Sequence, residues 1–109
     1  MMKYNIIVQS SAEHDLHSIK NHIAGYQHEP KTALDVVEAI QKEIESLESM
    51  PERYQLAADE EFAQMGVRIT SAGKYLIFYT VDKANKTVHI LNVQHGRREW
   101  RNILFKSDL

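Results

Sequence analysis

Apolar and polar residues alternate from Lys3 to Gln9, which predicts a first strand with at least one buried face. The next four residues, Ser10 to Glu13, have the Ser-x-x-Glu spacing of a capping box, in which a hydroxyl and a carboxylate each bind an unpaired amide at a helix start. A helix is therefore expected from this point to about Gly25. Its apolar residues recur every three or four positions, at Ala12, Leu16, Ile19 and Ile23.

A second helix is predicted by the run that begins at Pro30 and ends at Met50-Pro51. Proline suits the first turn of a helix because that position needs no amide donor. Only a few residues separate the two helices, so we expect an antiparallel hairpin whose shared apolar stripe lies on a sheet. The apolar positions of the second helix are Ala33, Val36, Val37, Ile40, Ile44 and Leu47.

Residues 52–65 have no clear periodicity, and Asp59-Glu60-Glu61 marks either a charged loop or a short helix start. The element order β-α-α-β-β-β follows, an α+β fold with an antiparallel meander in a small mixed sheet. The two-helix hairpin would cover one face of that sheet, and the opposite face would remain open for a site. The strands of the meander, separated by polar turns, are predicted at 67–70, 74–81 and 87–94.

With 109 residues, 43% of them hydrophobic, the chain suits a single domain, residues 1–109. It contains no run of about 18 apolar residues, and its first residues lack the apolar segment of a secretory signal. A cytoplasmic protein without membrane association is therefore expected. The absence of cysteine excludes disulfides, cysteine-zinc sites and thiol catalysis.

Charge is divided unevenly along the chain. Residues 1–65 contain five Lys and Arg against twelve Asp and Glu, whereas residues 66–109 contain eight against three. We interpret the acidic half as a solvated helical surface. The basic half suggests a surface for an anionic partner, because such binding requires cations that are concentrated on one face.

Arg68 is the first candidate for a functional site. It lies between Val67 and Ile69 in a short predicted strand, so its side chain points to the face opposite theirs. There it would either pair with a surface carboxylate or clamp a phosphate, since a guanidinium presents a planar fork to two oxygens.

His95, Arg97 and Arg98 lie within four positions, and Gly96 allows the backbone to leave the strand. Attack of a ribose 2′-hydroxyl on the neighbouring phosphate needs a base, an acid and a cation near the transition state, roles suited to a histidine and two arginines. Alternatively, the arginines form salt bridges at the end of the chain and His95 completes the edge of the core.

Tyr75 and Tyr79 are four residues apart in one predicted strand and therefore lie on one face. They are either core residues or, if that face is the open one, stacking surfaces for bases or for a partner helix. Trp100 is expected in a short helical turn that packs back on the sheet together with Ile103 and Leu104.

No metal site is predicted, because His14 and His17 lack a third ligand at a recognisable spacing. The sequence also contains no Gly-rich phosphate loop and no serine nucleophile elbow. We therefore expect no cofactor.

The order of these motifs resembles that of the RelE/ParE superfamily of bacterial toxins, the inhibitory half of type II toxin–antitoxin pairs. The resemblance covers nearly the whole chain and implies a toxin that arrests growth when free. It also implies neutralisation by a cognate antitoxin, in a toxin–antitoxin hetero-oligomer. The similar motifs are Leu47-x-x-Met50-Pro51, Gly66-Val67-Arg68, the strand Tyr75–Asp82 and the closing His95-Gly96-Arg97-Arg98-Glu99-Trp100.

Two activities are compatible with this resemblance. RelE-like members cleave messenger RNA in the ribosome with basic residues and often a C-terminal tyrosine; Arg68 and Arg98 match those arginines, but Leu104 stands at the tyrosine position. ParE-like members inhibit DNA gyrase without cutting nucleic acid, and the closing motif here is more similar to theirs. The acidic first half also disfavours contact with ribosomal RNA.

A ParE-like inhibitor of DNA gyrase is therefore the preferred interpretation, and a RelE-like endoribonuclease acting on ribosome-bound messenger RNA is the alternative. An inactive member that only binds its antitoxin is a third. In the nuclease interpretation the catalytic residues are Arg68, His95 and Arg98. The residues predicted to contact the target or the antitoxin are Tyr75, Tyr79, Arg97, Arg98, Trp100 and Arg101.

Overall fold

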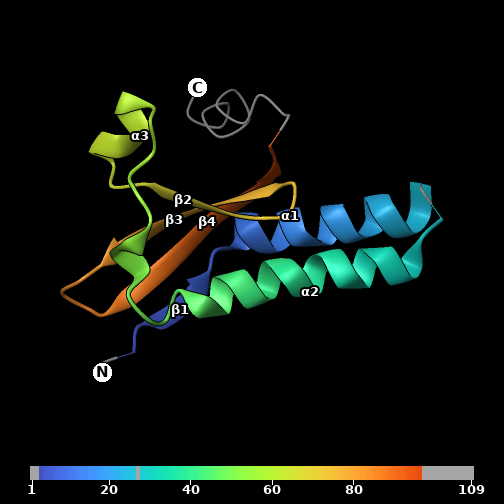
Figure 1. The fold of residues 1–109 in the computed structure, drawn as a ribbon, viewed down its shortest axis with the longest axis horizontal. Coiled ribbons are helices and arrows are strands. Elements are labelled where there is room, and N and C mark those ends of the chain that lie inside the picture. The colour runs from blue at the N-terminus through green and yellow to red at the C-terminus, as the bar shows by residue number, and fades with distance from the viewer. Residues whose placement is uncertain (1–2, 27, 97–109) are drawn as a thin grey trace.

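The computed structural model describes residues 3–26 and 28–96 (Figure 1). These residues form a four-stranded mixed sheet with a helical hairpin on one face. In space the strands follow the order β1-β4-β3-β2, with β1 parallel to β4 and the other pairs antiparallel. The predicted α+β fold with its mixed sheet and meander is confirmed. The strands are β1 (Asn5–Val8), β2 (Arg68–Ala72), β3 (Tyr75–Asp82) and β4 (Thr87–His95).

The hairpin consists of α1 (Ser10–Asn21), which continues into a π-helical turn η1 (His22–Tyr26), and α2 (Pro30–Ser46). Both helices lie where the apolar periodicity predicts them. The predicted capping box is wrong, because Gln9 occupies the N-cap of α1 without a side-chain hydrogen bond. Ser11 donates its hydroxyl hydrogen bond to the carbonyl oxygen of Leu91 in β4, at 2.6 Å, and so joins the helix to the sheet.

The main core lies between the hairpin and the sheet. Most of its members are buried aliphatic side chains, and burying one such side chain stabilises a fold by about 1.5 to 3 kcal/mol. The apolar stripe predicted for α2 therefore holds the hairpin on the sheet. The fully buried members include Ile40 of α2 and Leu47 at its C-cap, Ile77 and Tyr79 of β3, and Val88 and Ile90 of β4.

The opposite face of the sheet is partly covered, so the expectation of an open face is wrong in part. The short helix α3 (Glu60–Gln64) lies over it (Figure 1), and Phe62 packs on Phe78 with ring centroids 6.3 Å apart. Asp59 caps this helix, because its carboxylate accepts a hydrogen bond from the Phe62 amide at 3.2 Å. Of the two sequence alternatives for this charged run, the helix start is the observed one.

A β-bulge interrupts the regular alternation of β4. Tyr79 of β3 pairs with Ile90, and the preceding residue of β3 pairs with Asn92, so Leu91 has no partner in β3. An unbroken two-residue period from Ile90 would point His95 away from the hairpin. The inserted residue reverses this direction, and His95 lies on the hairpin side, against Tyr75.

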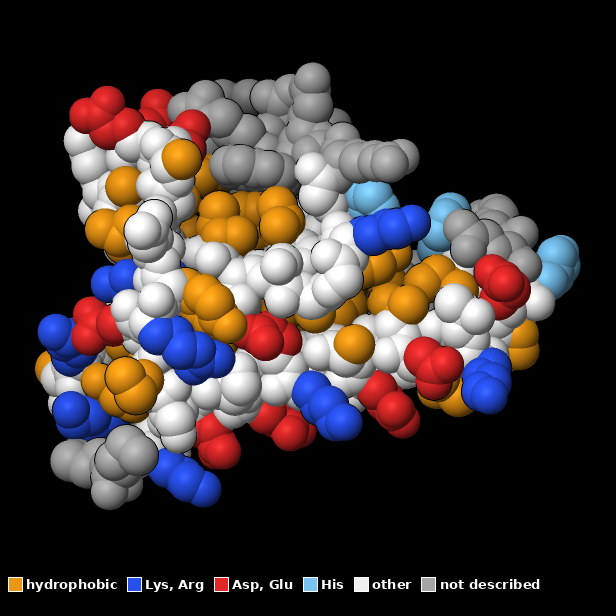
Figure 2. Space-filling view, in the orientation of Figure 1, with side chains coloured by type: hydrophobic (Ala, Val, Ile, Leu, Met, Phe, Trp, Pro, Cys, Tyr) orange, Lys and Arg blue, Asp and Glu red, His pale blue; other side chains and the backbone are white. Residues whose placement is uncertain are grey.

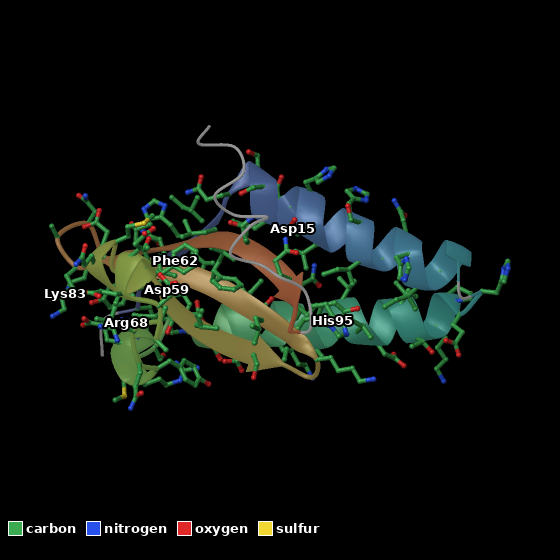
Figure 3. The ribbon with its side chains drawn as sticks, turned by 90° about the horizontal axis from the view of Figure 1, so that it is seen from above. Asp15, Asp59, Phe62, Arg68, Lys83 and His95 are labelled. Atoms are coloured by element: carbon green, nitrogen blue, oxygen red, sulfur yellow. The ribbon has the colours of Figure 1, made fainter. Side chains whose placement is uncertain are left out.

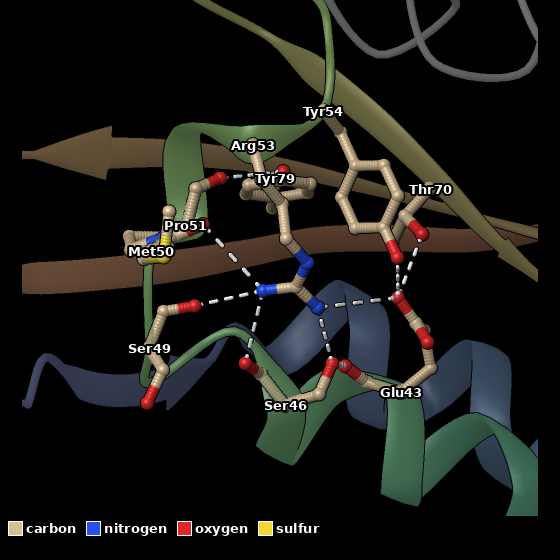
Figure 4. A network of polar contacts seen from close by, with 9 residues as sticks. All are labelled: Glu43, Ser46, Ser49, Met50, Pro51, Arg53, Tyr54, Thr70 and Tyr79. Atoms are coloured by element: carbon tan, nitrogen blue, oxygen red, sulfur yellow. Dashed lines mark hydrogen bonds and ion pairs between the residues drawn. The ribbon is translucent and has the colours of Figure 1, made fainter.

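Arg53 binds the polar groups at the C-terminal end of α2 (Figure 4). Its guanidinium donates to the carbonyl oxygen and the hydroxyl of Ser46, at 3.1 and 2.7 Å. One carboxylate oxygen of Glu43 lies 3.8 Å from Arg53 and accepts hydrogen bonds from the hydroxyls of Tyr54 and Thr70, at 2.9 and 2.8 Å. Carbonyl groups left unpaired at a helix end need such donors. The cluster therefore joins α2 to β2 and to the 3₁₀ turn Pro51–Arg53.

The packing of Tyr79 can be tested through the pH dependence of the protein's stability. Its side chain is fully buried, and its hydroxyl donates to the carbonyl oxygen of Pro51 at 2.7 Å. Burial raises the pKa of Tyr79 from 10.0 to about 12, although the positive charges of Arg68 and Arg53 act in the opposite direction. Stabilisation from this group is complete below pH 10 and is lost as the pH rises through about 12.

We therefore expect Tyr79→Phe to reduce the loss of unfolding free energy between pH 10 and about 12, measured by urea denaturation. Both proteins contain the same other titrating groups, so the difference between them isolates this hydroxyl. An equal loss in the two proteins would contradict the assignment.

Candidate functional site

A groove with a cavity volume of about 780 Å³ lies between the hairpin and the ends of β3 and β4. His14 and Asp15 of α1 and His22 of η1 line one side. Tyr75 of β3 and His95 of β4 line the other. Residues that are up to 81 positions apart along the chain thus meet in one concave surface, which is where ligands and partners bind most often.

Tyr75 and His95 are the two predicted site residues that the fold brings together. They pair across β3 and β4, and their rings meet edge to face, with centroids 5.3 Å apart and planes at 81°. Burial raises the pKa of the Tyr75 hydroxyl above its usual value, so this group remains a neutral hydrogen-bond donor at neutral pH. The pair therefore presents an aromatic surface with polar atoms at its edge.

Asp15 holds the bulge that directs His95 into the groove. Its Oδ2 accepts hydrogen bonds from the backbone amide of Val93 at 2.9 Å and from the side-chain amide of Asn92 at 3.2 Å. Sequence reasoning missed this residue. The signal was present, because Ser11 and Asp15 are four residues apart and so form a polar pair on one face of a helix that packs on the sheet.

Arg68 lies at the other end of the sheet from His95 (Figure 3). Its guanidinium donates to the carbonyl oxygen of Tyr54 at 2.6 Å and lies 3.3 Å from a carboxylate oxygen of Glu52. Arg68 pairs with Tyr79 of β3, whereas His95 pairs with Tyr75, so the two side chains are offset by four residues of β3, roughly 13 Å along the strand, and stand on strands that are not neighbours. Pairing with a surface carboxylate is thus the observed arrangement, and the structure does not bring Arg68 to His95.

Tyr79 belongs to the main core, so its interpretation as a stacking surface is wrong and the core alternative is the observed one. The alternation of β3 does place it on the face of Tyr75, as predicted, but the hairpin covers that face. Tyr75 is half-buried at the groove and stays a predicted contact. The remaining predicted contacts lie outside the described residues and stay predictions: Arg97, Arg98, Trp100 and Arg101.

Residues 3–26 and 28–96 contain neither a metal-binding cluster nor a membrane-spanning helix. No group of three or more His, Cys, Asp or Glu side chains in this part of the chain is arranged to hold a metal ion. No helix in the same ranges is long and apolar enough to cross a membrane.

Comparison with known proteins gives a family match over most of the chain. Residues 6–100 match the family model described as the ParE toxin of the type II toxin-antitoxin system, parDE. No curated protein sequence matches the chain.

Solved structures share the fold. A chain from the chromosomal ParDE system of P. aeruginosa has a TM-score of 0.70 at 18% identity, covering 85% of this chain and 96% of that one. A chain from the RelBE2 toxin–antitoxin complex of Mycobacterium tuberculosis has a TM-score of 0.60 at 26% identity, covering 86% and 99%. A mutant of E. coli toxin RelE in the free state has a TM-score of 0.65 at 13% identity and covers 99% of both chains.

The position of Arg68 predicts a contribution to stability. Arg68→Ala should lower the free energy of unfolding by about 1 to 2 kcal/mol, because its side chain, only 18% exposed, loses an ion pair and a hydrogen bond to a carbonyl. Lys83→Ala is the matched control. Lys83 pairs with the same Glu52 but is 66% exposed, so its removal should cost less than about 0.5 kcal/mol. Equally small effects in urea denaturation would exclude a structural role for Arg68.

Proposed function

Since this chain belongs to the family of ParE toxins of type II toxin–antitoxin systems, we propose that it arrests bacterial growth when free by inhibiting DNA gyrase. A cognate antitoxin neutralises it in a toxin–antitoxin complex. Because gyrase acts on the bacterial chromosome, the protein works in the cytoplasm. Inhibition of this kind requires a binding surface and no bond cleavage by the toxin itself.

The separation of Arg68 from His95 is the observation that favours gyrase inhibition over RNA cleavage. Cleavage of a phosphodiester requires the base, the acid and the stabilising cation to meet at one phosphate. Arg68 is instead bound to Glu52 and to the Tyr54 carbonyl at the far end of the sheet. The family match to ParE supports the same choice.

RNA cleavage is the second candidate, and one observation favours it. The bulge directs His95 into a groove beside Tyr75, and Arg98 follows three residues later in the sequence. His95 and Arg98 would in that case supply proton transfer and charge stabilisation without Arg68.

Purified toxin added to DNA gyrase should abolish supercoiling or cause cleaved DNA to accumulate. The same toxin added to programmed ribosomes should yield no new RNA ends, because Arg68 lies far from His95. If the nuclease alternative holds, codon-positioned ends will appear while gyrase stays active. His95→Ala or Arg98→Ala should then lower cleavage by roughly 100-fold or more, since such groups act on the transition state.

Expression of the chain without a partner should arrest growth of bacterial cells. Normal colony formation at confirmed soluble expression would leave only the inactive, antitoxin-binding alternative.

The antitoxin is expected to bind the basic C-terminal run with an acidic or amphipathic segment. Arg97→Glu combined with Arg98→Glu should therefore weaken the complex and reduce its dependence on salt, measured by titration calorimetry at two ionic strengths. Lys31→Glu combined with Lys42→Glu makes the same change of charge on the exposed surface of α2 and should leave affinity nearly unchanged. Unchanged affinity and salt dependence in the arginine variant would exclude this contact surface.

A further inference from the structure

Asp15 is one of two carboxylates in α1 and α2 that are not exposed to solvent; Glu43 is the other. The remaining carboxylates of these helices are exposed, and Figure 2 shows acidic side chains along α2. Asp15 and Glu43 each accept two hydrogen bonds, Asp15 from β4, and Glu43 from Tyr54 and from Thr70 of β2. A carboxylate bound in this way holds its donors in place, because such bonds are stronger than those between neutral groups.

The edge of β4 that faces α1 is bonded by side chains instead of a strand. The pairing of β1 with β4 ends at Ile90, and in the described part of the chain no strand continues beside β4 on that side. Ser11 of α1 donates to the Leu91 carbonyl at 2.6 Å, and Asp15 accepts from the Val93 amide at 2.9 Å. Val93 is only 1% exposed, so water would not replace a lost acceptor there.

Asp15 is bound to the bulged form of β4. The Ile90 carbonyl accepts an amide hydrogen bond at 2.9 Å from the residue that follows β1, so the backbone polar groups of Ile90 face that side. In a regular strand those of Asn92 would be the next to face it. Because the bulge adds one residue, the Val93 amide faces α1 instead, and the Asn92 side chain binds the same carboxylate oxygen at 3.2 Å.

The residues that follow the bulge are closely fitted against β3. The rings of His95 and Tyr75 meet with centroids 5.3 Å apart. The Gly96 amide donates to the Lys74 carbonyl at 2.8 Å, and a Cβ atom on Gly96 would lie 3.3 Å from that oxygen. Arg97 and the rest of the closing motif follow directly in the sequence, so the end of β4 determines where they begin.

We propose that Asp15 is a positioning residue of the toxin. By holding the bulged end of β4, it places His95 beside Tyr75 and sets the point from which residues 97–100 of the closing motif start. It acts through the backbone amide of Val93 and is therefore distinct from the residues predicted to contact a partner. This inference rests on the proposed function, in which the closing motif contacts the target or the antitoxin.

Asp15→Ala and Asp15→Asn in the full chain test the proposal. Nuclear Overhauser contacts between the ring protons of Tyr75 and His95 report on the position of His95, and growth arrest on expression reports on function. Asp15→Ala should lose both, while circular dichroism shows that the helices and the sheet are retained. Asp15→Asn keeps an oxygen that can accept the two bonds, so it should restore the ring contact and the arrest.

Glu43→Ala is the matched control. It also removes a carboxylate that accepts two hydrogen bonds, so it should lower stability while the ring contact and growth arrest remain. An unchanged ring contact in Asp15→Ala, growth arrest despite its loss, or loss of the whole fold in that variant would overturn the proposal. If the wild-type chain does not arrest growth, the proposed function fails, and the ring contact still decides whether Asp15 positions His95.

Discussion

The contact between Asp15 and the bulge of β4 is the interaction on which the arrangement of this molecule depends. The inserted Leu91 leaves backbone groups without partners in β3, and an unpaired buried polar group costs about 1 to 3 kcal/mol. Asp15 accepts from the Val93 amide, and Ser11 donates to the Leu91 carbonyl. These bonds hold α1 against β4 and stabilise the bulge. They therefore also determine on which face of the sheet the side chain of His95 lies.

The two ends of the sheet consequently differ in their capacity to bind a partner. At one end, Arg68 is paired with Glu52 and Arg53 with Glu43, so these cations already have acceptors within the protein. A ligand there would have to break existing bonds. At the other end, Tyr75 and His95 face a groove that solvent or a partner can enter. Binding is therefore expected where the structure leaves concave surface, and the ion pairs are interpreted as structural.

The scaffold is shared with proteins of both ParDE and RelBE systems at 13 to 26% identity. A fold common to these systems does not specify a target, because function depends on the side chains that a fold presents. The chain's family is that of ParE. Within this scaffold, Arg68 lies far from His95 and is bound to Glu52 and to the carbonyl oxygen of Tyr54.

The sequence by itself determined the two helices of the hairpin, the strands of the meander and the resemblance to the toxin superfamily, because periodicity and motif order are properties of neighbouring residues. It also left Tyr79, Arg68 and residues 59–61 with two alternatives each. Only the tertiary structure decided between these alternatives, since Tyr79 is bound to Pro51 and Arg68 to Glu52, and the helix that begins at Glu60 packs on Phe78 of β3. The bulge is the clearest case. Asp15 and Val93 are 78 positions apart, and no local pattern shows that their bond reverses the side on which His95 lies.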